Sequence, residues 1–326
     1  MNKVLKYSYH SVFAKYIEGL ILQKKECGYV YDTESYTMKR FDEFCSDNGY
    51  SDALITRDIA MKWALQRDTE GVNYRNHRVS VLRQLSIYMN SMGISSYIPR
   101  RQPSTATSIP HIPDANELRE LFQVVDNYLP EQKCWHIYAM EYRVLFRLYY
   151  CCGLRLAEGC YLRRDNVDHD KGVLTIMGSK GRRDRLVYMA DDLTILCKQY
   201  DDRMSDYYPD REWFFPGRID GRPFGKTSVD LKFRQLWEMT ECSKHCEKRP
   251  TVHALRHAFV VDRINKWMGE GVSLEAMMPY LSRYLGHSTI NDTLYYYHHV
   301  REAFRIVRQK DRTSDKIIPG VVKYEE

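Results

Sequence analysis

Apolar residues recur at helical spacing through the first hundred residues, and each run ends at residues that favour a turn. The first run forms one apolar stripe of Val12, Phe13, Tyr16, Ile17, Leu20 and Ile21. Gly28 is predicted to stop this helix, and the next run begins with Asp32 or Thr33 as its N-cap and ends at Asn48 and Gly49. Two further runs follow, the last with one apolar side of Val79, Leu82, Leu85 and Met89. Residues 1–100 are therefore predicted to form a bundle of roughly four helices.

The stretch "PRRQPSTATSIPHIPD", from Pro99 to Asp114, breaks the helical pattern with four prolines and no apolar periodicity. We predict an extended linker at residues 101–113. A new helix is expected to start after Asp114 as its cap, followed by the strongly apolar and buried run "WHIYAMEYRVLFRLYYCCG". The chain therefore divides into two domains, as its length of 326 residues also suggests.

A second change of pattern occurs in "KGVLTIMGSKGRRDRLVYMA". Residues Val173 to Met177 and Arg185 to Met189 favour β-strands and flank a turn rich in glycine and basic residues, which predicts a β-hairpin. From Ser228 onward the pattern is helical again, and the tail after Arg312 does not look helical. The second domain is thus expected to be mixed α/β within a mainly α protein.

The charge distribution adds a candidate partner. The net charge of +6 permits nucleic acid binding without establishing it. No acidic residue occurs between Gly71 and Pro113, a stretch that contains Arg75, Arg78, Arg83, Arg100 and Arg101. These arginines are candidates for contacts with DNA phosphates, and the alternative is a merely solvated basic face.

Cysteine usage and hydropathy bear on the cellular compartment. The nine cysteines are scattered and lie mostly in apolar runs, which favours a reduced intracellular protein over a disulfide scaffold. Neither a signal-peptide pattern nor a run long enough to span a membrane is found, so a cytoplasmic protein with no membrane partner is expected.

Several polar residues stand inside apolar helical runs, where an uncompensated charge is costly. Arg155 lies in "YYCCGLRLAEGCYL", and its simplest interpretation is a buried pair with Glu158. His253 and Arg256 share one helical face in "TVHALRHAFV", and His287 follows a glycine that could end a helix. Two arginines and two histidines in weakly polar surroundings indicate an anionic ligand, and the planar fork of arginine suits phosphate.

Metal sites are a weaker interpretation of the same region. His253 and His257 have the spacing of a helical zinc pair, but Ala254 stands where the zinc-protease motif needs glutamate. Cys242, His245 and Cys246 match no common zinc spacing. We therefore predict neither a metal site nor a cofactor.

Five motifs occur in order over residues 112 to about 312: "GLRLAE", a hairpin lysine in "GSKGRRDRLVYM", "HALRHAF", "LGH" and "TLYYYHH". Together they resemble the catalytic domain of tyrosine recombinases (phage-type integrases). The front domain is similar in size and helical character to the SAM-like core-binding domain of these enzymes, and one N-terminal stretch is similar to recombinases of bacterial transposons. The resemblance implies a helical core-binding domain at 1–100, a linker at 101–113, and a catalytic domain at 114–326 with a small antiparallel sheet.

The resemblance also implies roles for the motif residues. Arg155 and Arg256 would clamp the scissile phosphate, and Lys180 would be the general acid that protonates the leaving 5′-oxygen. His253 and His287 would donate hydrogen bonds to the phosphate or help move protons. Supporting roles would fall to Glu158, which steadies the first arginine, and to His257.

The nucleophile must be chosen among Tyr295, Tyr296 and Tyr297. The family usually places it nine residues after the "LGH" histidine and three after a threonine, and both rules select Tyr296. Consecutive helical positions are about 100° apart, so at most one of the three phenols can point squarely into a single pocket. We expect Tyr296 to be the nucleophile and its neighbours to pack.

The resemblance further implies double-stranded DNA as partner, a homotetramer on two DNA sites, and possible accessory or sister recombinases. Two alternatives remain open at this point. A type IB topoisomerase uses the same chemistry, and a catalytically silent recombinase could act as a DNA-binding accessory protein. Dependence of cleavage on a particular DNA site would separate the first alternative, and an unaffected Tyr296→Phe variant would favour the second.

Overall fold

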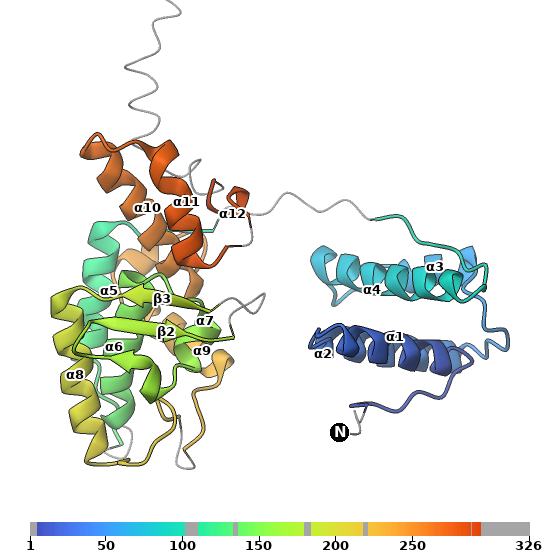
Figure 1. The fold of residues 1–326 in the computed structure, drawn as a ribbon, viewed down its shortest axis with the longest axis horizontal. Coiled ribbons are helices and arrows are strands. Elements are labelled where there is room, and N and C mark those ends of the chain that lie inside the picture. Colours follow the sequence, from blue (N-terminus) through green and yellow to red (C-terminus); the bar gives the residue numbers. More distant parts are fainter. Residues whose placement is uncertain are drawn as a thin grey trace, which may run out of the picture. The chain divides into compact units, whose positions relative to one another are not determined.

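The computed structural model of the chain describes residues 5–101, 110–132, 136–178, 184–217, 221–287 and 289–294. It divides into two compact units, Met1–Ile109 and Pro110–Glu326. In Figure 1 the colours follow the sequence, from blue in unit 1 to red near the end of unit 2. Most of the predicted linker, at 102–109, and the C-terminal tail lie outside the described residues.

The described residues of unit 1 form four helices, as the apolar periodicity predicted: α1 (Ala14–Glu26), α2 (Asp32–Asp47), α3 (Arg57–Ala64) and α4 (Val72–Ser91). Their apolar faces meet in one core, in which Phe41 packs edge-on against Trp63 with ring centroids 5.3 Å apart. The predicted core side of α4 is buried throughout. Helix α2 ends at Asn48 and Gly49 as expected, but its N-cap is Tyr31 rather than Asp32 or Thr33.

The cap of α2 was mispredicted because Tyr31 adopts a left-handed backbone conformation, with φ of 54°. This conformation is uncommon for a bulky residue and is not recognisable from sequence. Tyr31 is nearly buried, and its hydroxyl donates to Oε1 of Gln84 on α4 at 2.9 Å. Long-range packing therefore sets the start of α2.

Unit 2 is mainly helical, with six longer α-helices and two short ones among its described residues. The α-helices are α5 (Ala115–Asn127), α6 (His136–Cys151), α7 (Leu156–Cys160), α8 (Asp191–Ser205), α9 (Lys226–Glu238), α10 (His253–Gly269), α11 (Leu274–Leu285) and α12 (Asn291–Leu294). Asp114 caps α5 as predicted, and its carboxylate accepts backbone N–H groups of Asn116 and Glu117. Helix α6 runs through the core and contacts α5, α8 and α10.

The predicted hairpin is confirmed and belongs to a three-stranded antiparallel sheet of β1 (Val167–Asp168), β2 (Val173–Ile176) and β3 (Arg185–Tyr188). Ile176 pairs with Arg185 at the end of the hairpin next to its connecting segment. One face of the sheet is buried in the core of the unit through Leu174, Ile176 and Val187 (Figure 1). This packing fixes the base of the loop between β2 and β3.

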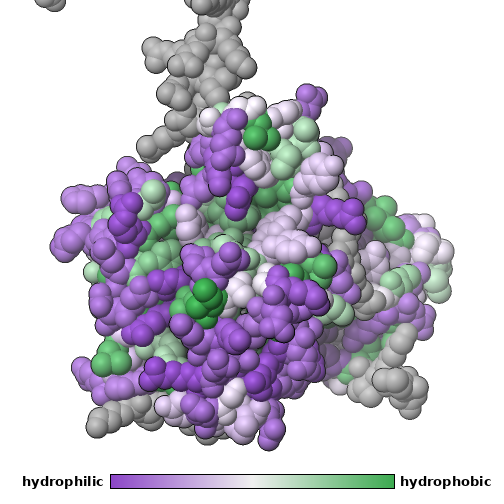
Figure 2. Space-filling model, turned by 60° about the vertical axis from the view of Figure 1, so that its left-hand side comes forward, coloured by the Kyte–Doolittle hydropathy of each residue, from purple (hydrophilic) through white to green (hydrophobic). Residues whose placement is uncertain are grey.

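In the described part of the chain, no helix combines the length and apolarity that a bilayer span needs. Hydrophilic residues predominate on the face shown in Figure 2, and hydrophobic residues interrupt them in separate patches.

Candidate functional site

The site is built around the turn that follows α11. Helix α11 ends at Leu285, and Gly286 adopts a left-handed conformation with φ of 65°. The N–H of His287 then donates to the Ser282 carbonyl at 3.0 Å, which closes the helix end. Glycine is the residue that tolerates this conformation best, so the "LGH" motif has a direct local meaning. The turn exposes the carbonyls of Leu285 and Gly286 to the arginines beside it.

Arg256 reaches this turn from α10 and is almost fully buried, at 1% exposure. Its Nη2 donates to the Leu285 carbonyl at 2.8 Å and approaches Nε2 of His287 at 3.0 Å. Its Nη1 donates to the carbonyl of Gly153 at 2.5 Å. Helix α10 thereby connects the "GLR" segment with the turn after α11.

Arg155 approaches the same turn from the start of α7. Its Nη2 donates to the Gly286 carbonyl at 2.5 Å, and its Nη1 donates to Glu158 at 2.9 Å. The pair with Glu158 that the sequence suggested is therefore present. The two predicted phosphate-binding arginines meet on adjacent carbonyls, although 101 positions separate them in the chain.

Arg185 on β3 is a member of this cluster that the sequence analysis missed. Its Nη1 and Nη2 each donate to one oxygen of Glu158 at 2.8 Å, and its Nε donates to the Tyr284 carbonyl at 2.7 Å. The side chain is only 7% exposed. In sequence it begins the predicted strand after the basic turn, and nothing near it in the chain marks Glu158 as its partner.

The carboxylate of Glu158 is ionised in these surroundings. Burial alone would raise its pKa, but the hydrogen bonds and charge of Arg185, together with those of Arg155, outweigh burial and bring the pKa to about 2. The backbone N–H of Arg155 also donates to Glu158, at 2.8 Å. Glu158 therefore carries a full negative charge at neutral pH.

His287 continues the network toward α12. Its Nδ1 lies 2.7 Å from Oγ1 of Thr293, which is fully buried. A guanidinium can only donate, so Nε2 of His287 accepts from Arg256 and the ring proton sits on Nδ1. Burial and the charges of Arg256 and Arg155 lower the pKa of His287 to about 4, which agrees with this neutral form.

His253 and His257 lie one turn apart on α10, with ring centroids 4.4 Å apart. Desolvation and the positive charges of Arg256 and Arg155 lower the pKa of His253. Because His253 is exposed, we attribute this effect mainly to the arginines. His253 is thus a neutral imidazole beside the cluster at neutral pH.

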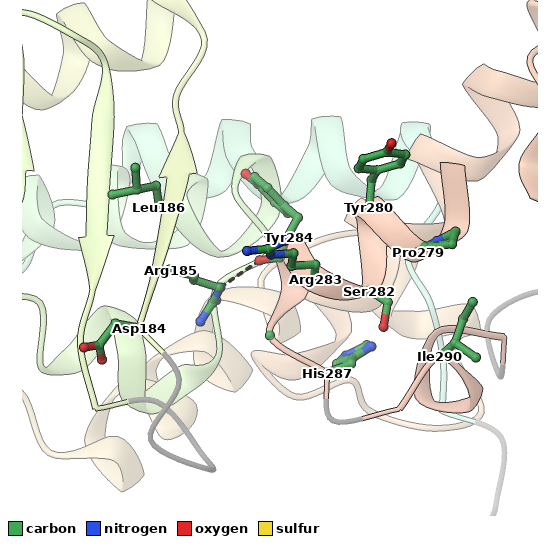
Figure 3. Close-up of a pocket in the computed structure, with 11 residues that line it drawn as sticks. Asp184, Arg185, Leu186, Pro279, Tyr280, Ser282, Arg283, Tyr284, His287 and Ile290 are labelled. Atoms are coloured by element: carbon green, nitrogen blue, oxygen red, sulfur yellow. Dashed lines mark hydrogen bonds between the residues drawn. The ribbon is translucent and has the colours of Figure 1, made fainter. Parts of the chain in front are cut away.

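An open pocket of about 960 Å³ lies beside the cluster. Figure 3 shows Arg185 and Asp184 of the hairpin on one side, and Tyr280, Ser282 and His287 on the other. The dashed line marks the bond from Arg185 to the Tyr284 carbonyl. A bulky anionic ligand could enter here and reach the cluster without unfolding either wall.

Two predicted site residues, Lys180 and Tyr296, lie outside the described residues. The elements next to them are described. Strand β2 ends at Ile176 and β3 begins at Arg185, so the two strands flank the segment that contains Lys180. Helix α12 contains Thr293, three positions before Tyr296.

The predicted phosphate-contacting arginines of unit 1 divide into two groups. Arg100 and Arg101 are exposed, and Arg75 and Arg83 are half-buried, with Arg83 donating to the Pro99 carbonyl at 2.7 Å. The prediction that Arg78 contacts DNA phosphates is corrected, because its side chain is buried at 1% exposure and cannot reach a phosphate without leaving the core.

Arg78 instead holds unit 1 together. It donates from Nε and Nη2 to the two oxygens of Glu70, and from its Nη atoms to the carbonyls of Trp63 and Leu65. Its guanidinium also lies 4.7 Å from the ring centroid of Trp63. All three guanidinium nitrogens donate inside the fold, which is typical of a buried structural arginine.

No group of three or more His, Cys, Asp or Glu side chains that could hold a metal ion occurs in the described parts of the chain. Cys242 approaches Oγ1 of Thr240 at 3.1 Å, and Cys246 approaches the Lys248 carbonyl at 2.8 Å. Both thiols therefore have local partners in the protein.

Comparison with known proteins shows similarity to integrases and recombinases. A sequence model described as "Phage integrase family" matches residues 114–303. A putative integrase/recombinase, y4rE of Sinorhizobium fredii, is 28% identical over 284 residues, which cover 86% of this chain and 89% of that protein. The tyrosine recombinase XerA of Thermococcus kodakarensis is 25% identical over 290 residues, 87% of this chain and 89% of that protein.

Solved structures share the fold. The site-specific recombinase XerH bound to a palindromic difH substrate matches with a TM-score of 0.62 and 16% identity, over 87% of this chain and 79% of XerH. A lambda integrase dimer bound to a COC′ core site matches with a TM-score of 0.60 and 16% identity, over 95% and 99%. The Tn1549 transposon integrase in complex with transposon right end DNA matches with a TM-score of 0.59 and 16% identity, over 90% and 99%.

Proposed function

The chain belongs to the phage integrase family, and on this basis we propose that it cleaves and rejoins DNA through a 3′-phosphotyrosyl link on Tyr296. It is a tyrosine recombinase, an enzyme that breaks and rejoins DNA. The predicted fold, mainly helical with a small antiparallel sheet, is the fold of its structural relatives.

One observation carries the assignment of residues: Arg155, Arg256 and His287 converge on the turn at Leu285–Gly286. We assign Arg155 and Arg256 to the non-bridging oxygens of the scissile phosphate. In the resting site the two arginines donate to the backbone carbonyls of Gly286 and Leu285. Phosphate oxygens are stronger hydrogen-bond acceptors than these carbonyls. Charge-assisted bonds to phosphate are roughly twice as strong as neutral ones. Such preorganised donors are the main source of rate enhancement in phosphoryl transfer.

Tyr296 is proposed as the nucleophile because Thr293 anchors the preceding turn of chain beside His287. The phenol oxygen attacks the phosphorus, and the bond from phosphorus to the 5′-oxygen breaks. The phenolic proton leaves toward a basic group, for which the neutral imidazole of His253 is a candidate. His287 becomes the second candidate once Arg256 turns to the phosphate and releases Nε2 of its ring. His257 would support His253 through their ring contact.

Lys180 is proposed as the general acid. It gives a proton to the departing 5′-oxygen, which leaves as a hydroxyl group. The phosphodiester energy is kept in the phosphotyrosine, so the reverse attack by a 5′-hydroxyl reseals the DNA and regenerates the phenol. The step balances without a nucleotide or an oxidant.

We propose that residues 1–100 form a core-binding domain and residues 114–326 the catalytic domain, and that both contact duplex DNA. The exposed Arg100 and Arg101, with Arg75 and Arg83, would contribute salt-dependent phosphate contacts. A homotetramer on two DNA sites, with the possible help of accessory or sister recombinases, is the proposed working assembly. The binding of a lambda integrase dimer to one core site supports an assembly of this kind.

The proposal is tested by trapping the covalent intermediate. The full chain is incubated with duplexes carrying the sequences that flank its own gene, nicked near the cleavage point so that the small product diffuses away. Denaturing electrophoresis and peptide mass spectrometry then locate the DNA-linked residue. We expect an adduct on Tyr296 that is absent in Tyr296→Phe and present in Tyr295→Phe and Tyr297→Phe.

Other outcomes assign the alternatives. An adduct on Tyr295 or Tyr297 would keep the reaction and overturn the choice of nucleophile. Efficient relaxation of any supercoiled plasmid, without dependence on a DNA site, would favour a type IB topoisomerase. Tight DNA binding with no adduct on any tyrosine would favour a catalytically silent accessory protein.

A further inference from the structure

Arg185 occupies a place in the cluster that the proposed reaction does not yet use. It begins β3, and its guanidinium joins three elements: β3 itself, Glu158 on α7 and the Tyr284 carbonyl near the end of α11. The side chain is 7% exposed and that of Glu158 is 5% exposed. A buried, bidentate arginine–carboxylate pair has a defined geometry and holds both partners in place.

The charges around Glu158 show what Arg185 adds. Arg155 and Glu158 alone would form a pair with no net charge, because one guanidinium and one carboxylate cancel. The guanidinium of Arg185 donates one hydrogen bond to each oxygen of Glu158, whereas that of Arg155 donates to Oε1. Two guanidinium groups and one carboxylate leave a net charge of +1 on this group of three. That surplus positive charge lies where an anionic phosphate would bind.

The same bonds also fix the turn after α11. Arg155 and Arg185 both approach Gly286, since a Cβ added there would lie 3.3 Å from Nη1 of Arg155 and 3.2 Å from Nη1 of Arg185. Arg185 anchors the carbonyl of Tyr284, and Arg155 donates to that of Gly286. The two arginines therefore both hold the turn, each through one of its carbonyls.

We propose that Arg185 is a positioning residue of the phosphate site: by neutralising Glu158 and tying it to α11, it leaves Arg155 cationic toward the scissile phosphate. The inference rests on the proposed function, because it assigns Arg155 to that phosphate. Arg185 itself acts through Glu158 and does not touch the DNA.

The test compares DNA cleavage by variants that remove the positive charge of Arg185, with and without the negative charge of Glu158. Arg185→Ala leaves Glu158 uncompensated beside Arg155, and we expect single-turnover cleavage at saturating DNA to fall by about 10²-fold, the size of effect that a small misplacement in an active site produces. Adding Glu158→Gln removes the excess negative charge. The double variant Arg185→Ala/Glu158→Gln is expected to cleave at least about tenfold faster than Arg185→Ala, a strongly non-additive result for residues in direct contact.

A second readout uses the substrate. A methylphosphonate at the scissile position lacks one negative charge and depends less on the positive charge of the site. We expect the defect of Arg185→Ala, measured relative to wild type on the same substrate, to shrink by about tenfold or more on the methylphosphonate. Arg155→Ala should show the same shrinkage, since both variants reduce the same positive charge.

The matched control is Arg147→Ala. Arg147 lies in the same unit and pairs with Asp126 at 2.7 Å, but on the surface between α5 and α6. It should cleave both substrates like wild type. Circular dichroism and thermal melting check that each variant is folded, and if Arg185→Ala is not, Arg185→Lys replaces it. Lysine keeps the charge but not the fork, so we expect about a tenfold loss that does not shrink on the methylphosphonate.

Two results would overturn the inference. An Arg185→Ala defect that is unchanged by Glu158→Gln and equally large on the methylphosphonate would mean that Arg185 only stabilises the fold. Normal cleavage by Arg185→Ala would mean that it has no role in the reaction. In both cases the wild-type adduct on Tyr296 remains, whereas failure of the wild type to form any adduct would remove the proposed function itself.

Discussion

Nδ1 of His287 lies 2.7 Å from Oγ1 of Thr293, and this contact joins the turn after α11 to the short helix α12. The other ring nitrogen, Nε2, accepts a hydrogen bond from Arg256. Nδ1 therefore carries the ring proton and donates to Oγ1 of Thr293. Thr293 thus sets both the tautomer of His287 and the place from which the chain continues toward Tyr296. A threonine three residues before the proposed nucleophile therefore has a structural reason in this protein.

Replacing Thr293 by valine removes this acceptor and keeps the shape of the side chain. We expect Thr293→Val to lower the free energy of unfolding by about 1–3 kcal/mol, the usual cost of an unsatisfied buried donor. Covalent adduct formation should slow by at least about tenfold while DNA affinity is unchanged. Urea unfolding, single-turnover cleavage and gel-shift titration measure the three quantities. Thr293→Ser retains the hydroxyl and should behave like wild type, and equal cleavage by the valine variant would refute the role given to Thr293.

Gly286 should not tolerate a side chain. A Cβ would force a left-handed conformation on alanine, costing roughly 1–2 kcal/mol, and would crowd the guanidinium groups of Arg155 and Arg185. We expect Gly286→Ala to cleave about 10²-fold more slowly, measured with the nicked duplex at saturating protein.

Gly269 provides the matched control for this substitution. It is the last residue of α10, its φ is not positive, and nothing lies within 4 Å of an added Cβ. Gly269→Ala should cleave at the wild-type rate and be as stable or slightly more stable, because alanine favours the helix. A wild-type rate for Gly286→Ala would contradict the close packing of the turn.

The lowered pKa of His287 predicts a pH dependence of stability. Its folded-state pKa is about 4, below the ordinary value of 6.5, so on acidification the unfolded chain binds a proton first. The contribution of His287 is therefore present above about pH 6.5 and is lost as the pH falls toward 4. We expect a loss on the order of 1–2 kcal/mol, since the residue is only partly buried.

Urea unfolding of wild type and His287→Gln between pH 4 and pH 7 isolates this contribution. The stability difference between the two proteins should narrow as the pH falls through the window. A difference that stays constant would mean that His287 is protonated to the same extent in the folded and unfolded chains.

Substitution of a buried and of an exposed arginine in unit 1 should have different effects, on stability for Arg78 and on DNA binding for Arg100. Arg78→Ala leaves the buried carboxylate of Glu70 without its partner, and we expect a loss of about 3–5 kcal/mol in the unfolding free energy of unit 1. Arg100→Ala removes an exposed charge and should leave stability unchanged. It should weaken DNA binding and reduce the slope of log affinity against log salt by about 1.

Denaturant unfolding and salt-dependent DNA titration of both variants make the comparison. An Arg100→Ala variant with unaltered salt dependence would remove this residue from the DNA contact surface. An Arg78→Ala variant as stable as wild type would contradict the structural role of the buried pair.

The sequence by itself determined those features that depend on neighbours a few positions apart. Apolar periodicity located α1 to α4 and the two strands of the hairpin, because burial of one face repeats with the geometry of the element. The "LGH" glycine predicted the end of α11, since the left-handed cap is a local requirement. The ordered motifs selected Arg155, Arg256 and His287, which the fold then brought together.

Tertiary structure alone decided which charges meet. Arg78 and Arg100 look alike in a basic stretch, and only the position of Glu70 and Trp63 makes the first a core residue. Arg185 likewise gained its role from Glu158, which lies 27 positions earlier in the chain and reaches it through the packing of α7 beside the sheet. The reason is physical: helix and strand patterns follow from short-range geometry, whereas the partner of a charged side chain depends on which distant segments the folded core brings within hydrogen-bonding distance.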